Sequence, residues 1–280
     1  MLAPPEIGGD IRDNGVPFPG GVLLVAPHMD DETLGCGALL TSFDWDGEMH
    51  VAFATDGARS PLETPRCSAS TELPGIRRRE AYAAMAVLGI EDGNVHFLDM
   101  PDGGLRWQMG RLGTRLRELV DRTRPAFLLV PFRYDRHPDH LAINHVAVNI
   151  VREDRARALR LVEYFVYAKW RLLPSGDVRQ CLHRERIVQI EPDAAAMRKR
   201  MALACYRSQT TLFYPWQKRP ILTNALVNRV CAEPETFVVH GPASFDRKVF
   251  ARSRRWIPVA HRIEPVLKRG KDRVVEWLQH

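Results

Sequence analysis

Four short apolar runs, separated by segments of helix length, constrain the fold of this chain more than any other feature. The runs occupy residues 21–26, 49–57, 95–98 and 125–132. Their apolar residues are mostly continuous rather than alternating with polar ones, which is typical of strands covered on both faces in a parallel sheet. The segments between them repeat apolar residues at helical spacing. The pattern predicts a Rossmann-like α/β fold, in which a doubly wound, mostly parallel sheet carries helices on both faces as three α/β/α layers.

The chain has 280 residues, enough for one large α/β domain. We expect an N-terminal extension over 1–20, a single domain over 21–240, and a basic C-terminal extension over 241–280. Within the domain, further strands are predicted in 159–168 and 186–190.

The composition favours a cytoplasmic protein. No apolar stretch reaches the roughly 18 residues that a membrane-spanning helix needs, and the first residues lack the basic start and apolar core of a secretory signal. The cysteines are odd in number and form no C-x-x-C pair, which favours reduced thiols. They are Cys36, Cys67, Cys181, Cys205 and Cys231.

The net charge of +6 is unevenly distributed. From Asp246 to the end there are ten Lys or Arg residues and four acids. Two interpretations are open: a solvated surface, or a face for an anionic partner that includes peripheral contact with a membrane. The segment does not show the regular aromatic interleaving of a nucleic-acid platform, so we expect no nucleic-acid partner.

The first apolar run ends at a proline and is followed by His28, Asp30, Asp31 and Glu32. Three acids at the start of a helix stabilise its N-terminus, so a helix cap is one interpretation. The other is a metal site.

A second polar cluster repeats this arrangement. His137, Asp139 and His140 follow the fourth apolar run and precede another helical segment. The carboxyl ends of parallel strands share one edge of a sheet, and ligands bind there in open α/β folds. We therefore expect the two clusters to converge.

Together the clusters contain the parts of a catalytic metal site. His28, Asp31 and one imidazole of the second cluster form a three-ligand set that leaves a position for water, as catalytic zinc sites do. Asp30 is placed to act as a general base, and the remaining imidazole can stabilise an oxyanion. Asp139 can orient one of the imidazoles.

Other residues receive structural interpretations. We expect His145 on a helix face, His50 and His96 in the core or at the edge of the sheet, and Cys36 as a small packing residue. Two other metal enzymes remain alternatives, a non-haem iron oxygenase and a two-metal phosphoesterase.

The segments "PHMDDETLGCG" and "HPDH" resemble the motifs of the LmbE-like (PIG-L) family of zinc-dependent N-deacetylases. The segments "TDGARS", "HFLDMPDGGL" and "ACYRSQ" occur in the order found in that family, so the resemblance covers about residues 21–209. Where this family usually has proline after the first histidine, this chain has Met29, which should change the rigidity of the loop without removing a ligand.

The resemblance implies one zinc ion (Zn2+) per chain and a role for each residue of the site. The implied metal ligands are His28, Asp31 and His140, the catalytic residues are Asp30, His137 and Asp139, and the substrate contacts are Arg77 and Asp102. Asp30 would be the general base, and His137 would face the amide oxygen with support from Asp139.

The implied function is hydrolysis of the N-acetyl group of an N-acetylglucosamine-type amino-sugar conjugate. The basic excess of the chain favours an anionic conjugate, and the chain can form a homo-oligomer. The alternatives are a metal-dependent amidase for another acylamino natural product and a catalytically silent sugar-binding protein of the same fold.

Overall fold

The structure is a computed structural model of the chain. It describes residues 18, 20–42, 48–61, 70–135, 137–154, 158–166, 171–172, 176–177, 185–192 and 195–240. The predicted basic extension 241–280 and almost all of the predicted extension 1–20 lie outside the described residues, so these boundaries stay predictions.

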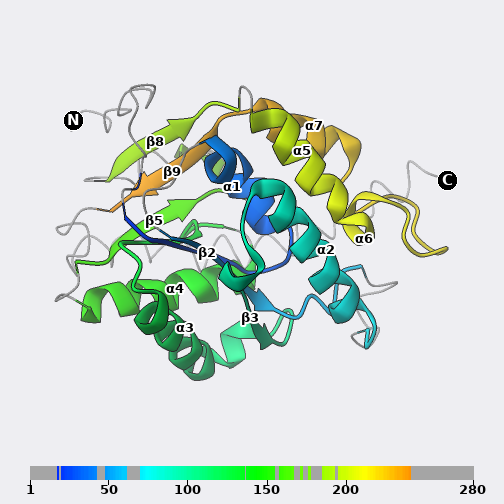
Figure 1. Cartoon of the computed structure of the whole chain (residues 1–280). Coiled ribbons are helices and arrows are strands. Elements are labelled where there is room, and N and C mark those ends of the chain that lie inside the picture. Colours follow the sequence, from blue (N-terminus) through cyan, green and yellow to red (C-terminus); the bar gives the residue numbers. More distant parts are fainter. Residues whose placement is uncertain are drawn as a thin grey trace.

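Strands and helices alternate through the first part of the chain (Figure 1). The order begins β1 (Val22–Ala26), α1 (Asp31–Ser42), β2 (Met49–Thr55), α2 (Leu73–Leu88), η1 (Asp92–Asn94), β3 (Val95–Met100), η2 (Leu105–Trp107), α3 (Met109–Thr123), β4 (Phe127–Pro131) and α4 (Pro138–Glu153). It continues with β5 (Arg160–Tyr164), β6 (Arg171–Leu172), β7 (Gly176–Asp177), β8 (Arg186–Ile190), α5 (Ala195–Cys205), α6 (Arg207–Thr210), α7 (Asn224–Ala232) and β9 (Glu235–Val239).

The strands form a seven-stranded sheet in the order β3-β2-β1-β4-β5-β9-β8, and β6 and β7 pair separately. Strands β1 to β5 are parallel to one another, while β9 runs antiparallel to both β5 and β8. The predicted doubly wound, mostly parallel α/β sheet is confirmed. The antiparallel strand β9 has no counterpart in the sequence analysis.

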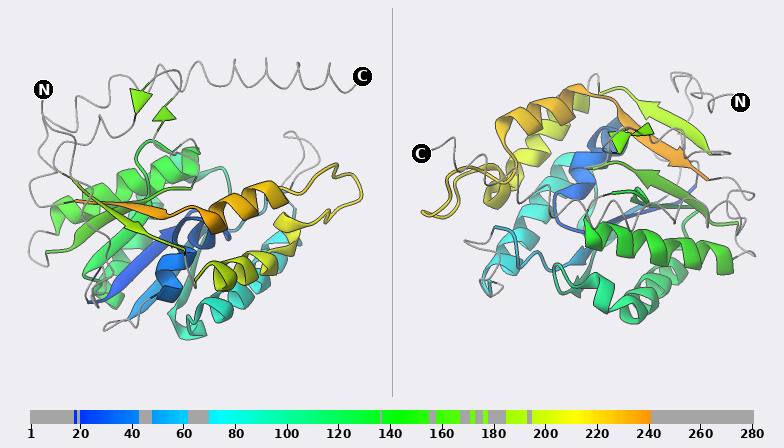
Figure 2. Two further views of the ribbon diagram at one scale, coloured as in Figure 1. Left: turned by 90° about the horizontal axis from the view of Figure 1, so that it is seen from above. Right: turned by 180° about the vertical axis from the view of Figure 1, so that it is seen from behind.

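Helices cover both faces of the sheet, as the views in Figure 2 show. Val22, Leu24 and Ala26 of β1 pack into one core with side chains of α1, α2 and α5. Leu23 and Val25 point the other way, into a second core with α3 and α4. Alternate residues of a strand face opposite sides of a sheet, so a strand covered twice must be apolar throughout. This explains the continuous apolar runs.

The neighbours of β1 determine where a ligand can bind. β1 lies between β2 and β4. The chain leaves β1 through α1 on one face and leaves β4 through α4 on the other. The two connections therefore leave the sheet in opposite directions at the carboxyl ends of β1 and β4, where ligands usually bind in this fold. Both polar clusters of the sequence lie in these two loops and in the first turns of α1 and α4.

A buried ion pair holds helix α1 in place. Lys199 Nζ lies 2.6 Å from Glu235 Oε1 and also donates to the Leu34 carbonyl at 3.0 Å. Glu235 in turn accepts hydrogen bonds from the backbone N–H groups of Ala38 and Leu39. The chain after β8 thus fixes the helix that begins at the first polar cluster.

Among the described residues, no helix combines the length and apolar character required to cross a membrane.

Helix α2 ends at Gly89, whose φ of 84° is left-handed.

Candidate active site

The first polar cluster forms the turn between β1 and α1. The Pro27 carbonyl accepts hydrogen bonds from the backbone and hydroxyl of Thr55, which tie the turn to β2. His28 Nδ1 lies 3.0 Å from Asp31 Oδ2, and this carboxylate oxygen also accepts the His28 backbone N–H. The Asp31 carboxylate therefore turns back toward His28 although Asp31 is the first residue of the helix.

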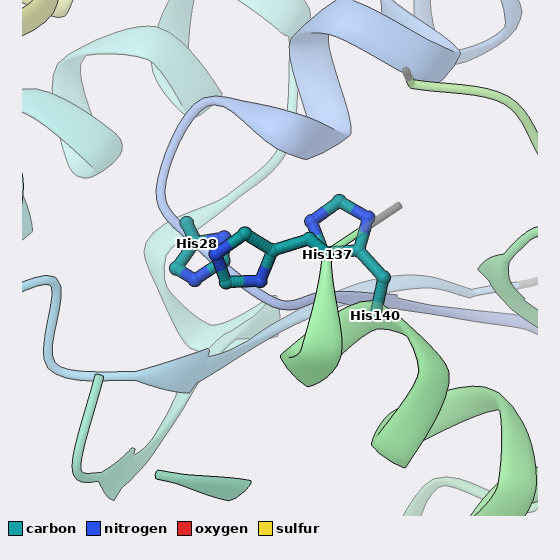
Figure 3. A group of neighbouring side chains, drawn as sticks. All are labelled: His28, His137 and His140. Atoms are coloured by element: carbon teal, nitrogen blue, oxygen red, sulfur yellow. The ribbon is translucent and has the colours of Figure 1, made fainter. Parts of the chain in front are cut away.

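The second cluster begins α4. His137 is the N-cap, Pro138 takes the first turn, and Asp139 and His140 follow. His140 Nε2 lies 3.1 Å from Asp31 Oδ2, the oxygen that contacts His28. The imidazoles of His28, His137 and His140 approach one another from the two loops (Figure 3). The expected convergence is confirmed.

The donor atoms suit a metal ion. His28 Nδ1 and His140 Nε2 both lie beside Asp31 Oδ2, and the other oxygen, Asp31 Oδ1, is buried without a hydrogen-bond partner among the described residues. Ligands of tetrahedral zinc, at about 2.0–2.2 Å from the ion, lie about 3.3 Å apart. Two further groupings could also hold an ion: His28 with His137 and His140, and His28 with Asp102 and Asp139.

The charges at the site favour a cation. Burial lowers the pKa of His28, but hydrogen bonds to Asp102, Asp139 and Asp31 raise it well above the ordinary histidine value. Burial likewise opposes the charged form of His140, yet Asp31 and neighbouring groups raise its pKa to about 9. These imidazoles hold protons because the surrounding carboxylates are negative, and a metal ion would replace that positive charge.

Asp135 was not identified from the sequence. Its Oδ2 atom lies 3.2 Å from Nδ1 of His140, on the side of the ring away from Asp31, and both side chains are fully buried. A carboxylate on the second nitrogen of a metal-binding imidazole fixes the ring and its tautomer. The sequence signal is an acid in the same strand-to-helix loop, ahead of the "HPDH" motif.

Asp30 lies between the candidate ligands His28 and Asp31 in the sequence and has a strained backbone conformation, with φ of 149°. Arg77 Nη2 lies 3.2 Å from Asp30 Oδ2, and both side chains are buried. Burial raises the pKa of Asp30 to about 7, while the charge of Arg77 opposes the increase. A carboxylate with a pKa near neutrality has the property of a general base.

Glu32 supports the backbone of Asp30. Its Oε2 atom accepts the Asp30 N–H at 3.0 Å, and the Tyr206 hydroxyl donates to its Oε1 atom at 2.6 Å. Both residues are buried. The third acid of the first cluster is therefore a support of the turn as well as part of the helix start.

Arg77 and Met29 are interior residues. Arg77 is 1% exposed and donates to the carbonyls of Met29 and Ser60. The Met29 side chain, also 1% exposed, packs in the core beside Gly57. The Met29 side chain therefore fills the interior, and the Met29 carbonyl holds Arg77. The predicted contact of Arg77 with substrate stays a prediction.

His137 presents one ring nitrogen to the site. Its Nδ1 atom accepts the Asp139 backbone N–H at 3.3 Å, so the proton of the neutral ring is on Nε2. Burial and the neighbouring imidazoles of His28 and His140 lower the pKa of His137 to about 4. The ring is neutral at pH 7 and is a hydrogen-bond donor through Nε2.

Asp139 and Asp102 hold the outer nitrogen of His28. Its Nε2 atom lies 3.4 Å from Asp139 Oδ2 and 3.3 Å from Asp102 Oδ1. The Asp139 carboxylate also accepts the backbone N–H groups of Gly103 and Leu105, which fasten the loop after β3 to α4. Asp139 thus contacts an imidazole of the site, while its orienting role and the role of Asp102 toward a substrate stay predictions.

The remaining residues of interest have structural positions. Cys36 is fully buried in the core, and His145 is exposed on α4. His50 and His96 pair across β2 and β3, with 3.2 Å between their ring nitrogens.

Residues 23–151 match the family described as PIG-L, GlcNAc-PI de-N-acetylase. A relative from Salinispora arenicola (strain CNS-205), 1D-myo-inositol 2-acetamido-2-deoxy-alpha-D-glucopyranoside deacetylase, is 28% identical over 183 residues. These cover 55% of this chain and 56% of that protein, so the chain spans little more than half the length of this relative.

Solved structures show the same fold. The N,N'-diacetylchitobiose deacetylase from Pyrococcus horikoshii, in complex with an inhibitor, matches with a TM-score of 0.60 and 18% identity over 85% of this chain and 90% of that chain. The A40926 pseudoaglycone deacetylase Dbv21 matches with a TM-score of 0.55 and 22% identity over 78% of this chain and 96% of that chain.

Proposed function

Residues 23–151 form a domain of the PIG-L family, and from this premise we propose that the chain is a zinc-dependent amide hydrolase. The reaction is removal of the N-acetyl group from an N-acetylglucosamine-type conjugate. The observation that carries the proposal is that Asp31 Oδ2 contacts a ring nitrogen of both His28 and His140, while His137 shares a possible metal-binding group with these two histidines. The named relatives, which are deacetylases of acetylated amino-sugar compounds, support it.

The proposed metal ligands are His28 Nδ1, Asp31 and His140 Nε2. When bound, a zinc ion supplies a Lewis acid for the amide carbonyl and lowers the pKa of its water toward 7. Asp135 and the pair Asp102 and Asp139 hold the outer nitrogens of the two imidazoles, so the ligands are oriented before the ion arrives.

Asp30 is the proposed general base. It accepts a proton from the attacking water and passes it to the nitrogen of the departing amine. Arg77 keeps the carboxylate in position by its contact at 3.2 Å, and Glu32 holds the backbone of Asp30. Burial provides a pKa near 7, which suits acceptance and return of a proton at neutral pH.

His137 is the proposed donor to the oxyanion. As the tetrahedral centre forms, the amide oxygen gains negative charge, and the Nε2–H group of His137 donates a hydrogen bond to it. Because Nδ1 is occupied by the backbone N–H of Asp139, the ring keeps this orientation.

The proposal is tested by incubating the purified protein with N-acetylglucosamine conjugates and measuring acetate release. We expect release that a chelator abolishes and zinc restores. Asp30→Asn should lower kcat at least 100-fold. The matched control is Asp99→Asn, because Asp99 is a half-exposed carboxylate in β3.

Unchanged turnover by Asp30→Asn would refute the assignment of the base. Acetate release from other acylamino compounds, with none from N-acetylglucosamine conjugates, would favour the broader amidase. Binding of sugar without any turnover would favour the silent sugar-binding protein.

A further inference from the structure

Exposed apolar side chains gather on one part of the molecule. We name α5, α6, α7 and the loop 211–223 the helical lobe. The described residues include six large hydrophobic side chains that are exposed. Five of these belong to the helical lobe: Met197, Met201, Leu212, Trp216 and Ile221. Three of them, Leu212, Trp216 and Ile221, lie within the single loop 211–223, and exposed apolar side chains that lie together mark an interaction surface.

The charge of the same segment has one sign. Residues 194–232 contain seven cations and no Asp or Glu. The cations are Arg198, Lys199, Arg200, Arg207, Lys218, Arg219 and Arg229. Lys199 is buried against Glu235 and Arg229 pairs with Glu233, which leaves the other five cations to create a positive field at the surface. A partner of this surface must therefore combine anionic and apolar groups.

The loop 211–223 extends beyond α6 (Figure 1), and contacts within the loop hold its conformation. Tyr214 and Gln217 exchange hydrogen bonds, from Tyr214 N to Gln217 Oε1 at 2.7 Å and from Gln217 N to the Tyr214 carbonyl at 3.0 Å. The Tyr214 and Trp216 rings stack with 5.4 Å between their centroids. Because these contacts hold the loop without a partner, little conformational entropy is lost when it binds.

Contacts also connect the loop with the candidate active site. The Leu222 N–H donates to the Gln209 carbonyl, which closes the base of the loop. The Gln209 side chain donates to the Ser60 carbonyl at 2.9 Å, and Arg77 donates to the same oxygen at 3.2 Å. Arg77 contacts Asp30. The base of the loop is therefore joined to the candidate site through Gln209 and Arg77.

We propose that the helical lobe docks on the surface of an anionic lipid bilayer. Tryptophan and tyrosine favour the boundary between headgroups and acyl chains, and Lys and Arg beside them bind anionic lipids. The aliphatic side chains Leu212, Ile221, Met197 and Met201 suit that boundary but have no role on a nucleic acid, where bases stack on aromatic rings. Docking brings the loop 211–223, which is joined to the candidate site through Gln209 and Arg77, to the membrane surface.

The experiment measures co-sedimentation of the full chain with vesicles of phosphatidylcholine alone or with 30% phosphatidylglycerol. We expect binding to the anionic vesicles that weakens as salt is raised. A triple variant, Leu212→Ser with Trp216→Ser and Ile221→Ser, should bind at least tenfold more weakly. Lys218→Glu with Arg219→Glu should also bind at least tenfold more weakly.

The matched control is Arg106→Glu with Trp107→Ser, which removes an exposed tryptophan and its stacked guanidinium outside the helical lobe. This control should bind as the unaltered chain does. Circular dichroism verifies that each variant is folded, and a variant that fails is replaced by the single change Trp216→Ser.

The proposal is overturned if the unaltered chain does not bind anionic vesicles, or if the variants of the helical lobe bind as well as the control. It is also overturned if an oligonucleotide displaces the protein from the vesicles and binds it equally well through Lys218 and Arg219. Since the assay needs no substrate, its result is separate from that of the acetate-release test.

Discussion

Asp135 Oδ2 lies 3.2 Å from His140 Nδ1, opposite the ring nitrogen that contacts Asp31. This contact orients a proposed metal ligand from outside the site. We expect Asp135→Asn to weaken zinc binding about 10- to 100-fold, because a neutral amide cannot stabilise the imidazole in the same way. Competition with a chromogenic chelator measures the affinity. Equal affinities of the variant and the unaltered chain would refute this role.

Removal of metal should lower thermal stability. A ligand that binds only the folded state stabilises it, so zinc added to chelator-treated protein should raise Tm. His140→Ala should abolish the increase. His145→Ala is the matched control, because it is an exposed histidine on the same helix and should keep the full increase. A zinc-dependent increase in the His140→Ala variant would place the ion elsewhere.

Removal of one partner of the buried ion pair Arg77–Asp30 should lower the free energy of unfolding. Arg77→Met leaves the Asp30 carboxylate buried without its cation, and we expect a loss of about 3–5 kcal/mol in the free energy of unfolding. Asp30→Asn in the same chain should recover part of this loss. Urea unfolding of both single variants and the double variant gives the coupling energy, and a value near zero would contradict the pairing.

Tyr206 should affect turnover without contacting substrate. Its hydroxyl holds Glu32, which holds the strained backbone of Asp30. We expect Tyr206→Phe to lower kcat about tenfold and leave KM almost unchanged, because the base is displaced while binding contacts remain. Steady-state kinetics separates the two constants. An increase in KM alone would indicate a role in binding.

A carboxylate outside the site should contribute to acid unfolding. Glu163 is buried, and burial alone would raise its pKa, but Arg133 and His240 lower it to about 2. Because its pKa is lower in the folded chain than in the unfolded chain, the ionised carboxylate stabilises the fold at pH values above about 4.5, the pKa in the unfolded chain. This stability is lost as the pH falls toward 2. Glu163→Gln should therefore show a shallower decline of Tm between pH 4.5 and 2. Thermal unfolding at a series of pH values measures the slope, and identical slopes would contradict the assignment.

Much of the fold was predictable because its pattern is local. The continuous apolar runs predicted buried parallel strands. Strand β9 was not predicted because it pairs antiparallel with β5 and β8, which are distant in sequence, and such pairing leaves no local signal.

Part of the candidate site could likewise be predicted from the sequence, and part could not. Its residue types and their place after two strands follow from the sequence alone, since parallel strands bring their carboxyl ends to one edge. Only the tertiary structure decided that Asp135 supports His140, that Tyr206 reaches Glu32, and that Arg77 lies buried against Asp30. These contacts join segments whose spacing carries no periodic signal, because packing in three dimensions, and not the local backbone, selects the partner of a buried charge.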